Sequence, residues 1–351
     1  MRLESLRAED GTRGGRMRLD RANRSFLAFM GIALLLAALV LCGALGGVLV
    51  PLILARVSRG ELAGLSGTSL LLVLPFVAFI AVGLGLGGRS LARQIVASRG
   101  LARRVRALAV TLPAELTGAA MQAGLEGRVA LVDASESFSF VYGVLTPRVA
   151  VSRGLLEGAS RGELRAVLEH EGYHVCNLDP LKVVLVRALS AALFFVPALG
   201  ALRARYVAGR ELAADRRAVA VCGRRSLAGA LLKVVRGPEW SELGVAASIG
   251  GHELLAVRVA QLETGAEPKP EALSAIRVML SLMGVALLVV AFLASVSSFG
   301  GPTAVHHVTG TGLATATLLG SLSCTAPFAV AGLLAYSLIA MRAGRPLRFG
   351  W

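Results

Sequence analysis

The sequence predicts a mainly α polytopic membrane protein that carries a small α+β cytoplasmic domain. The mean hydropathy is +0.69 and 55% of the 351 residues are hydrophobic, values typical of a chain with several membrane spans. The apolar residues are gathered in runs long enough to cross about 30 Å of hydrocarbon. The middle of the chain instead has short β-rich runs followed by helical periodicity, as expected for a mixed domain outside the bilayer.

Four apolar runs have the length of a membrane-spanning helix. The first is too long for a cleaved signal peptide and lacks a convincing cleavage site, so we expect an uncleaved anchor. A fifth run, 183–199, is shorter and contains Arg187 and Pro197. The four long runs are Phe26–Ala55, Ser69–Gly88, Val278–Phe299 and Leu313–Met341.

The formal net charge of +15 fits a membrane topology. Arginines crowd three segments, and an even number of spans separates each from the next, so the positive-inside rule places all three in the cytoplasm. A nucleic-acid-binding protein is the alternative explanation. It is disfavoured because no aromatic residues interleave the arginines and no DNA-binding motif is present. The basic segments are residues 1–25, 89–106 and 342–351.

These boundaries divide the chain into five parts. Residues 1–25 form a basic cytoplasmic arm, and residues 342–351 form a basic cytoplasmic tail. Residues 26–88 and 273–341 each contain two transmembrane helices, with short outer loops at 56–67 and 300–312. Residues 89–272 form the cytoplasmic domain. We therefore expect a multi-pass protein of the cell membrane, with the lipid bilayer as a partner.

The cytoplasmic domain contains recognisable local patterns. Its first segment, 89–106, is a basic amphipathic helix suited to the anionic inner leaflet. Ser160 and Glu163 have the spacing of a capping box, which predicts the start of a helix. That helix should end before Asp179-Pro180. The β-rich runs that predict a small sheet are 129–133, 138–142 and 148–152.

Residues 170–174 read His-Glu-Gly-Tyr-His, the HExxH spacing. Because a helix has about 3.6 residues per turn, His170 and His174 stack on one face and can reach one metal ion. Glu171 lies beside that face and can act as a general base without being a ligand. An ordinary helix with a buried histidine is the alternative. Two of the chain's five histidines occur here at this spacing, which favours the metal site.

A catalytic zinc ion usually has three protein ligands and one open position. Downstream, Glu211 and Asp215 are four residues apart and share a helix face. We expect Glu211 to ligate the metal and Asp215 to accept the free ring N–H of a histidine. Alternatively, both carboxylates could only form salt bridges with nearby arginines. The upstream HExxH favours the metal site, and we expect one Zn²⁺ per chain. The four cysteines form no close pair, which argues against a disulfide framework or a cysteine-based zinc site.

Several short motifs follow one another between Phe138 and about Val235. They are Gly143–Val149, Gly154–Leu156, Glu163–Leu168, the HExxH, Asp179-Pro180, and Glu211 with Asp215. With these motifs the chain resembles the integral-membrane gluzincin metallopeptidases. Two branches fit, namely the BlaR/MecR-type antibiotic-sensor peptidases and the HtpX and CAAX prenyl proteases. The resemblance implies that the cytoplasmic domain is a zincin-like metallopeptidase domain.

The resemblance also suggests a donor for the oxyanion. In the HtpX-like branch a His-Pro pair precedes an arginine by six residues, the spacing of His252 and Arg258 here. Glu253 replaces the proline, so His252 is either a catalytic residue or an ordinary surface histidine. His306 and His307 lie in the expected outer loop and cannot reach a cytoplasmic site.

The ligand set constrains the fifth apolar run. Because His170, His174 and Glu211 must meet at one ion, the chain between them must begin and end on the same side of the membrane. The run 183–199 therefore cannot be a single crossing. It is either a re-entrant hairpin bent near Pro197 or a helix buried under the catalytic domain.

Together these patterns predict a membrane-embedded zinc endopeptidase that cleaves a protein or peptide at the cytoplasmic face. The substrate would pair with an edge strand formed by 138–142 and contact Phe138, Ser139 and Phe140. A transcriptional repressor is one candidate substrate and a misfolded membrane protein another. A catalytically weak sensor or scaffold with a protease-derived fold is the alternative, and the intact Glu171 favours the enzyme.

Overall fold

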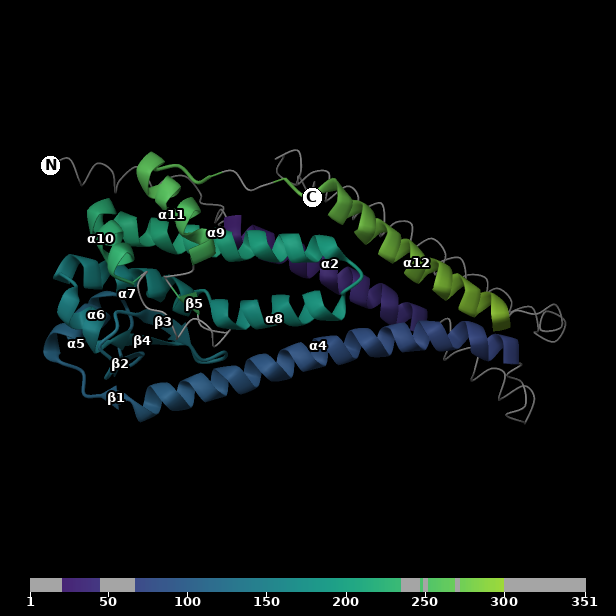
Figure 1. The fold of residues 1–351 in the computed structure, drawn as a ribbon, viewed down its shortest axis with the longest axis horizontal. Helices are drawn as coiled ribbons and strands as arrows, with labels where there is room; N and C mark the ends of the chain where they lie inside the picture. Colours follow the sequence, from purple (N-terminus) through teal and green to yellow (C-terminus); the bar gives the residue numbers. More distant parts are fainter. Residues whose placement is uncertain (1–20, 45–66, 235–246, 249–251, 269–271, 300–351) are drawn as a thin grey trace, which may run out of the picture.

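The computed structural model describes residues 21–44, 67–234, 247–248, 252–268 and 272–299. Figure 1 shows a small sheet surrounded by helices at one end of the molecule and three long helices toward the other end. The long helices are α2 (Arg21–Ala44), α4 (Gly67–Ala107) and α12 (Ala275–Phe299). Of these, α4 reaches the sheet and α12 lies away from it (Figure 1). The mainly helical fold with a small sheet is thus confirmed.

Two of the described helices are long and apolar enough to cross a membrane, within Ala22–Val40 and Phe76–Ala107. The apolar stretch of α12, Ala275–Val290, is shorter. The C-terminal ends of α2 and α12 and the N-terminal end of α4 lie together, furthest from the sheet (Figure 1). The expected span 313–341 and both expected outer loops lie outside the described residues.

The sheet is mixed and has the strand order β1-β2-β4-β3-β5. β2 and β4 are parallel, with Val129 opposite Val149, and the other pairs are antiparallel. The three β-rich runs of the sequence form β2, β3 and β4, as predicted. The strands are β1 (Ala109–Val110), β2 (Val129–Val132), β3 (Ser139–Tyr142), β4 (Arg148–Ser152) and β5 (Ala247–Ser248).

The prediction that 138–142 is an edge strand was wrong. β3 lies between β4 and β5, and it pairs with β5 through Phe140 opposite Ser248 and Val141 opposite Ala247. The two residues of β5 are small and stand more than a hundred positions after β3. A strand this short has no periodicity of its own, so its pairing with β3 could not be predicted from the sequence.

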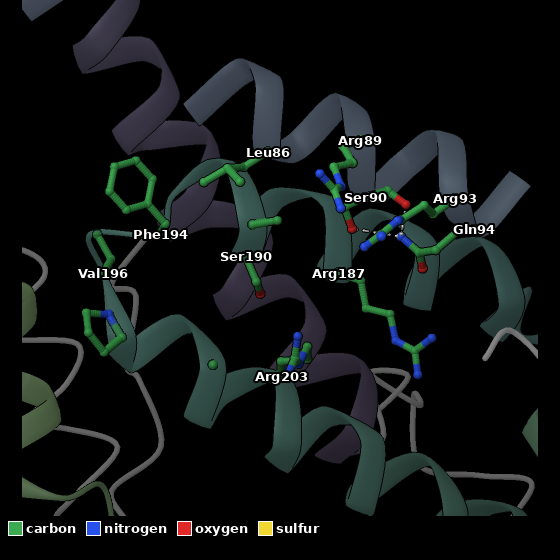
Figure 2. A pocket seen from close by; sticks show the side chains of 13 residues that line it. Leu86, Arg89, Ser90, Arg93, Gln94, Arg187, Ser190, Phe194, Val196 and Arg203 are labelled. Carbon is green, nitrogen blue, oxygen red and sulfur yellow. Dashed lines mark hydrogen bonds between the residues drawn. The ribbon is translucent and has the colours of Figure 1, made fainter. Parts of the chain in front are cut away.

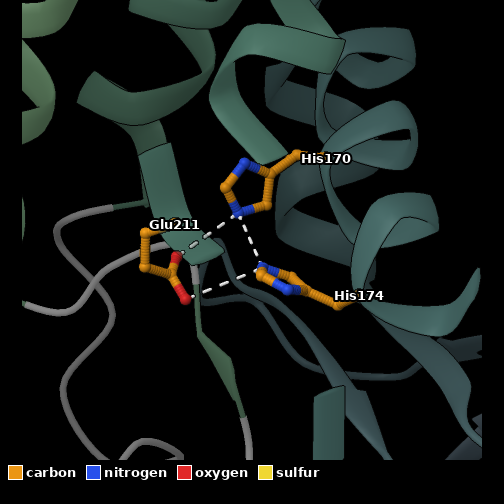
Figure 3. A group of neighbouring side chains, drawn as sticks. All are labelled: His170, His174 and Glu211. Carbon is orange, nitrogen blue, oxygen red and sulfur yellow. Dashed lines mark hydrogen bonds and ion pairs between the residues drawn. The ribbon is translucent and has the colours of Figure 1, made fainter. Parts of the chain in front are cut away.

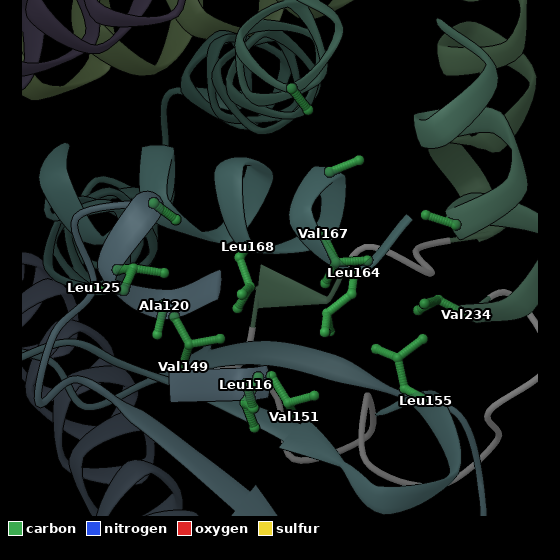
Figure 4. Packing of buried hydrophobic residues seen from close by; sticks show 14 of the residues in the cluster. Leu116, Ala120, Leu125, Val149, Val151, Leu155, Leu164, Val167, Leu168 and Val234 are labelled. Carbon is green, nitrogen blue, oxygen red and sulfur yellow. The ribbon is translucent and has the colours of Figure 1, made fainter. Parts of the chain in front are cut away.

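β3 separates its side chains between two helices because successive residues of a strand point to opposite faces. Phe140 and Tyr142 pack with Leu101 and Val105 of α4 on one face. Val141 joins the core beneath α7 on the other face. Figure 4 shows Leu164, Val167 and Leu168 of α7 packed over Val149 and Val151. The sheet is therefore enclosed between α4 and α7 (Arg161–Cys176), and α7 carries the HExxH residues.

The fifth apolar run forms a helical hairpin. α8 (Asp179–Ala192) ends before the run does, and α9 (Pro197–Cys222) begins at the proline where a bend was expected. α4 packs so closely along α8 that a Cβ atom at Gly83 would lie 2.7 Å from the carbonyl oxygen of Ala192. The remaining helices are α5 (Ala114–Gln122), α6 (Arg153–Gly158), α10 (Arg224–Val234) and α11 (His252–Thr264).

Candidate metal centre

α7 and α9 are the helices that present the candidate ligands. The predicted capping box at the start of α7 is confirmed, since the Ser160 hydroxyl accepts from the Glu163 N–H and the Glu163 carboxylate accepts from the Ser160 N–H. This cap fixes where the helix begins. His170 and His174 are one turn apart on one face of α7 and are both buried.

Three side chains converge between α7 and α9 (Figure 3). Nε2 of His170 lies 3.3 Å from Nε2 of His174. The Glu211 carboxylate lies 3.5 Å from Nε2 of His170 and 3.7 Å from Nε2 of His174. A tetrahedral site with bonds of about 2.0–2.1 Å holds its ligand atoms about 3.3–3.4 Å apart. The spacing of these three side chains therefore fits a zinc ion.

The carboxylate oxygens of Glu211 also fit a metal ligand. Both are buried, and neither accepts a hydrogen bond from the described part of the chain. Among the described residues, His170, His174, Arg210 and Arg258 lie within ion-pair distance of them, the closest being Nε of Arg210 at 3.2 Å. A buried carboxylate is normally satisfied by hydrogen bonds or by a cation. His170, His174 and Glu211 would hold the ion that completes this group.

Two further carboxylates contact the other ring nitrogens of the histidines. Oδ1 of Asp215 lies 2.8 Å from Nδ1 of His170, and Oδ2 of Asp179 lies 2.6 Å from Nδ1 of His174. Each contact favours the tautomer that leaves Nε2 free for a metal. The contact of Asp215 is the one that the sequence predicts. That of Asp179 is new, since the sequence identified Asp179 only as a helix-ending residue and a family motif.

Each of these carboxylates is itself held in place. Arg258 of α11 donates to both oxygens of Asp215, at 2.7 Å from Nε and 2.6 Å from Nη2. The Tyr206 hydroxyl donates to Oδ1 of Asp179 at 3.1 Å, and the Asn177 amide donates to the same oxygen at 2.7 Å. Arg258 is 1% exposed. An arginine between two valines in an apolar helix is the sequence signal for such a buried ion pair.

Glu171 is held by one oxygen only. The Ser139 hydroxyl donates to Oε1 at 2.7 Å, whereas Oε2 has no hydrogen-bond partner in the described part of the chain. The alternation of β3 places Ser139 on the α7 face of the sheet, which explains the contact. Burial raises the pKa of Glu171, although His170, His174 and Ser139 act to lower it. The free Oε2 is therefore the oxygen available to accept a proton.

The electrostatics of the cluster suit a cation. Burial acts to lower the pKa of His170, but its contacts with Asp215 and Glu211 outweigh burial and raise the pKa to about 9. Burial acts to raise the pKa of Glu211, but the charges of His174, His170 and Arg210 outweigh burial and lower it. The carboxylates that stabilise a proton on His170 would equally stabilise a bound metal ion.

The remaining predicted site residues lie elsewhere. His252 is the first residue of α11, and its side chain is outside the described residues. Phe138 and Phe140 are buried in the core on the α4 face of the sheet, away from the metal cluster. Their side chains therefore cannot line the site. Of the three residues expected to contact substrate, only Ser139 reaches the cluster, through Glu171.

Comparison with known proteins gives two findings. The family described as BlaR1 peptidase M56 matches residues 66–262. Proteins named Protease HtpX from Acinetobacter baumannii strains AYE and SDF are 45% identical over 65 residues, which is 18% of this chain and 22% of each relative. The chain thus aligns with about a fifth of the length of these curated relatives. The resemblance identified from the sequence motifs is confirmed.

Proposed function

Because the chain belongs to the BlaR1 peptidase M56 family, we propose that it is a membrane-bound zinc endopeptidase with its active site at the cytoplasmic face. One observation carries the proposal, namely the convergence of His170, His174 and Glu211 within 4.8 Å of one another. A bound zinc ion supplies a Lewis acid that lowers the pKa of a water molecule to about 7.

The side chains of this protein would perform the proton transfers. Glu171 accepts a proton from the attacking water through Oε2, because Oε1 is already bonded to Ser139. The raised pKa of Glu171 makes it a better base and then a suitable acid, which returns the proton to the leaving amine. Asp215 and Asp179 hold the two imidazoles in orientation during both steps.

The membrane topology is part of the same proposal. It is supported by the two helices that are long enough to cross a bilayer, α2 and α4, which both reach the end of the molecule furthest from the sheet (Figure 1). The basic segment 89–106 lies at the sheet end of α4, and the positive-inside rule assigns that end to the cytoplasm. A protein or peptide substrate, such as a transcriptional repressor, would be cleaved there.

The proposal is tested by Glu171→Gln. The amide keeps the shape of the side chain but cannot accept a proton, so we expect unchanged zinc content and loss of nearly all cleavage, about 10²–10⁴-fold. Detergent-purified protein with matched zinc content is assayed on casein and for self-cleavage. Glu169→Gln is the matched control, because Glu169 is also buried on α7 but pairs with Arg217 at 3.3 Å.

Two results would contradict the proposal. Full activity in Glu171→Gln would mean that another group is the base. A zinc-loaded wild-type protein that cleaves nothing in either assay would favour a sensor or scaffold with a protease-derived fold.

A further inference from the structure

A cavity lies between α4, α8 and α9, and none of its lining residues belongs to the metal cluster. Its volume is about 540 Å³. Figure 2 shows that it has two chemically different ends, with Leu86, Phe194 and Val196 at one end and arginine side chains at the other. A cavity of this size could hold part of a small amphiphilic molecule.

The polar end carries a surplus of positive charge. Arg89 and Arg93 are one turn apart on α4, Arg187 comes from α8 and Arg203 from α9. None of the lining residues in the described part of the chain is acidic. Burial, and then the charges of Arg210 and Arg203, lower the pKa of Arg187. The protonated guanidinium is therefore held there at a cost that a bound anion would offset.

Two polar atoms of the cavity lack partners. Oγ of Ser190 and Oε1 of Gln94 are buried, and neither has a hydrogen-bond partner among the described residues. The Gln94 amide nitrogen donates to the carbonyl oxygens of Ser90 and Val184, at 3.2 and 3.4 Å, so only its oxygen is left over. Buried polar atoms are normally satisfied. A hydroxyl donor and an acceptor oxygen are thus available beside the arginines.

The cavity lies where the apolar run of α4 ends. That run extends to Gly88, so Leu86 belongs to it and Arg89 directly follows it. Phe194 is 41% exposed in the turn between α8 and α9, beside the apolar end. In a membrane, this level of α4 corresponds to the boundary between hydrocarbon and head groups.

We propose that the cavity binds the phosphate head group of an anionic phospholipid, with the arginines on the phosphate and an acyl chain against Leu86 and Phe194. Guanidinium groups bind phosphate through charge-assisted hydrogen bonds, and basic pockets between helices at the cytoplasmic interface suit such head groups. A hydroxylated head group such as glycerol would also donate to Oε1 of Gln94. A choline head group would instead add a further positive charge beside the four arginines. The inference rests on the membrane location in the proposed function, but not on peptidase activity.

The test uses full-length protein in detergent and native mass spectrometry with phosphatidylglycerol or phosphatidylcholine. We expect saturable binding of phosphatidylglycerol that the Arg89→Gln/Arg93→Gln variant weakens at least about tenfold. The matched control is Arg99→Gln/Arg103→Gln, which removes the same charge from the same helix at the same spacing but outside the cavity. The control should bind as wild type does.

A second variant changes volume without changing charge. Gly200 lines the cavity, and a Cβ atom there would meet nothing within 4 Å, so Gly200→Leu fills the space without a backbone clash. It should abolish binding of phosphatidylglycerol. Equal weakening in both double variants, or unchanged binding in Gly200→Leu, would overturn the proposal in favour of general surface charge.

Inorganic phosphate distinguishes the source of the phosphate group. Millimolar phosphate should not displace the lipid, because it gains nothing from the apolar end. Displacement by phosphate with the same dependence on Arg89 and Arg93 would assign the cavity to a free phosphate and overturn the lipid assignment. Zinc content and casein cleavage are measured on the same samples. Wild-type protein that cleaves casein but binds no phosphatidylglycerol would refute this inference alone, whereas wild-type protein that binds the lipid but cleaves nothing would count against the proposed function alone.

Discussion

The metal cluster and the basic cavity both use residues of α8 and α9, but their charges are balanced in opposite ways. Around the cluster four buried carboxylates face two buried guanidinium groups, a surplus of two negative charges when the histidines are neutral. The cavity has four arginines and no acidic lining residue in the described part of the chain. The carboxylates are Glu171, Asp179, Glu211 and Asp215, and the guanidinium groups are Arg210 and Arg258.

The difference indicates what each place can bind. A divalent cation offsets the negative surplus of the cluster, and an anion reduces the positive surplus of the cavity, so each surplus has the sign that attracts its proposed ligand. The cluster is also more constrained, because its side chains are buried and Asp179, Asp215 and Glu171 each accept hydrogen bonds from neighbouring side chains. Substitutions there should therefore have larger effects than substitutions in the cavity, and their order should follow the distance from the proposed metal position.

The largest effect on metal binding is expected from Glu211→Ala. Removing the third ligand leaves two histidines, which is too few for a stable zinc site, so zinc content should fall to near zero. Metal analysis of detergent-purified protein measures it. Glu267→Ala serves as the control, because Glu267 pairs with Arg216 of the same helix, outside the cluster. Equal zinc in Glu211→Ala and wild type would remove Glu211 from the site.

A smaller effect is expected from Asp215→Ala. Loss of a carboxylate that orients a ligand histidine typically lowers metal affinity about 10–100-fold. The buried Arg258 also loses its bidentate partner, so thermal stability should fall as well. Chelator competition measures the affinity.

The companion variant Asp179→Ala should behave like Asp215→Ala, since it frees the other histidine. Asp133→Ala, which removes an exposed ion pair with Arg153, should leave zinc affinity unchanged. Affinity in Asp215→Ala equal to that of wild type would reduce Asp215 to a structural ion pair with Arg258. Loss as complete as in Glu211→Ala would make it a ligand.

The contrast between the two places also explains what the sequence could predict. Four residues of the cluster could be predicted from the sequence, because helix periodicity places residues four apart on one face. They are His170, His174, Glu211 and Asp215. The positions of Asp179 and Ser139 in the cluster depend on how α8 and β3 pack against α7, which periodicity does not specify. The contact of Arg258 with Asp215 likewise depends on the packing of a third helix, α11.

The basic cavity could not be predicted from the sequence for the same reason. The sequence pattern around Arg89 and Arg93 indicates a helix on the membrane surface. Arg187 interrupts an apolar run. Only the packing of α4 on the α8–α9 hairpin brings them together. The edge-strand error has a similar origin, because β5 pairs with a strand that is distant in sequence.

Ser139→Ala should affect catalysis but not metal binding. The hydroxyl donates to Glu171 and so helps to lower its pKa, and without it the pKa of Glu171 should rise further. The base then works only at higher pH, so the acidic limb of the pH–rate profile should move upward, and kcat at neutral pH should fall about tenfold. Zinc content should be unchanged. Ser139→Thr, which keeps the hydroxyl, should restore the profile. An unshifted profile in Ser139→Ala would assign Ser139 to packing alone.

The smallest effect is expected at the start of α7, outside both the metal cluster and the basic cavity. The hydrogen bond from Lys233, and then the bond from the Ser160 N–H, outweigh burial and lower the pKa of Glu163 below 4.5. A carboxyl whose pKa is lower in the folded state stabilises the fold above its unfolded pKa, and this contribution is lost as pH falls through the folded value. Glu163→Gln isolates that charge, because glutamine can still complete a capping box. At pH 7 we expect the variant to be less stable by under about 1 kcal/mol, as for other partly exposed ion pairs. The difference from wild type should shrink as pH falls below 4.5, in thermal denaturation of the detergent-solubilised protein.

Ser160→Ala is the comparison, since loss of the cap costs about 1 kcal/mol and the cost does not depend on ionisation of its hydroxyl. A Glu163→Gln deficit that stays constant between pH 7 and pH 3 would show that the side chain acts through its shape and not through its charge.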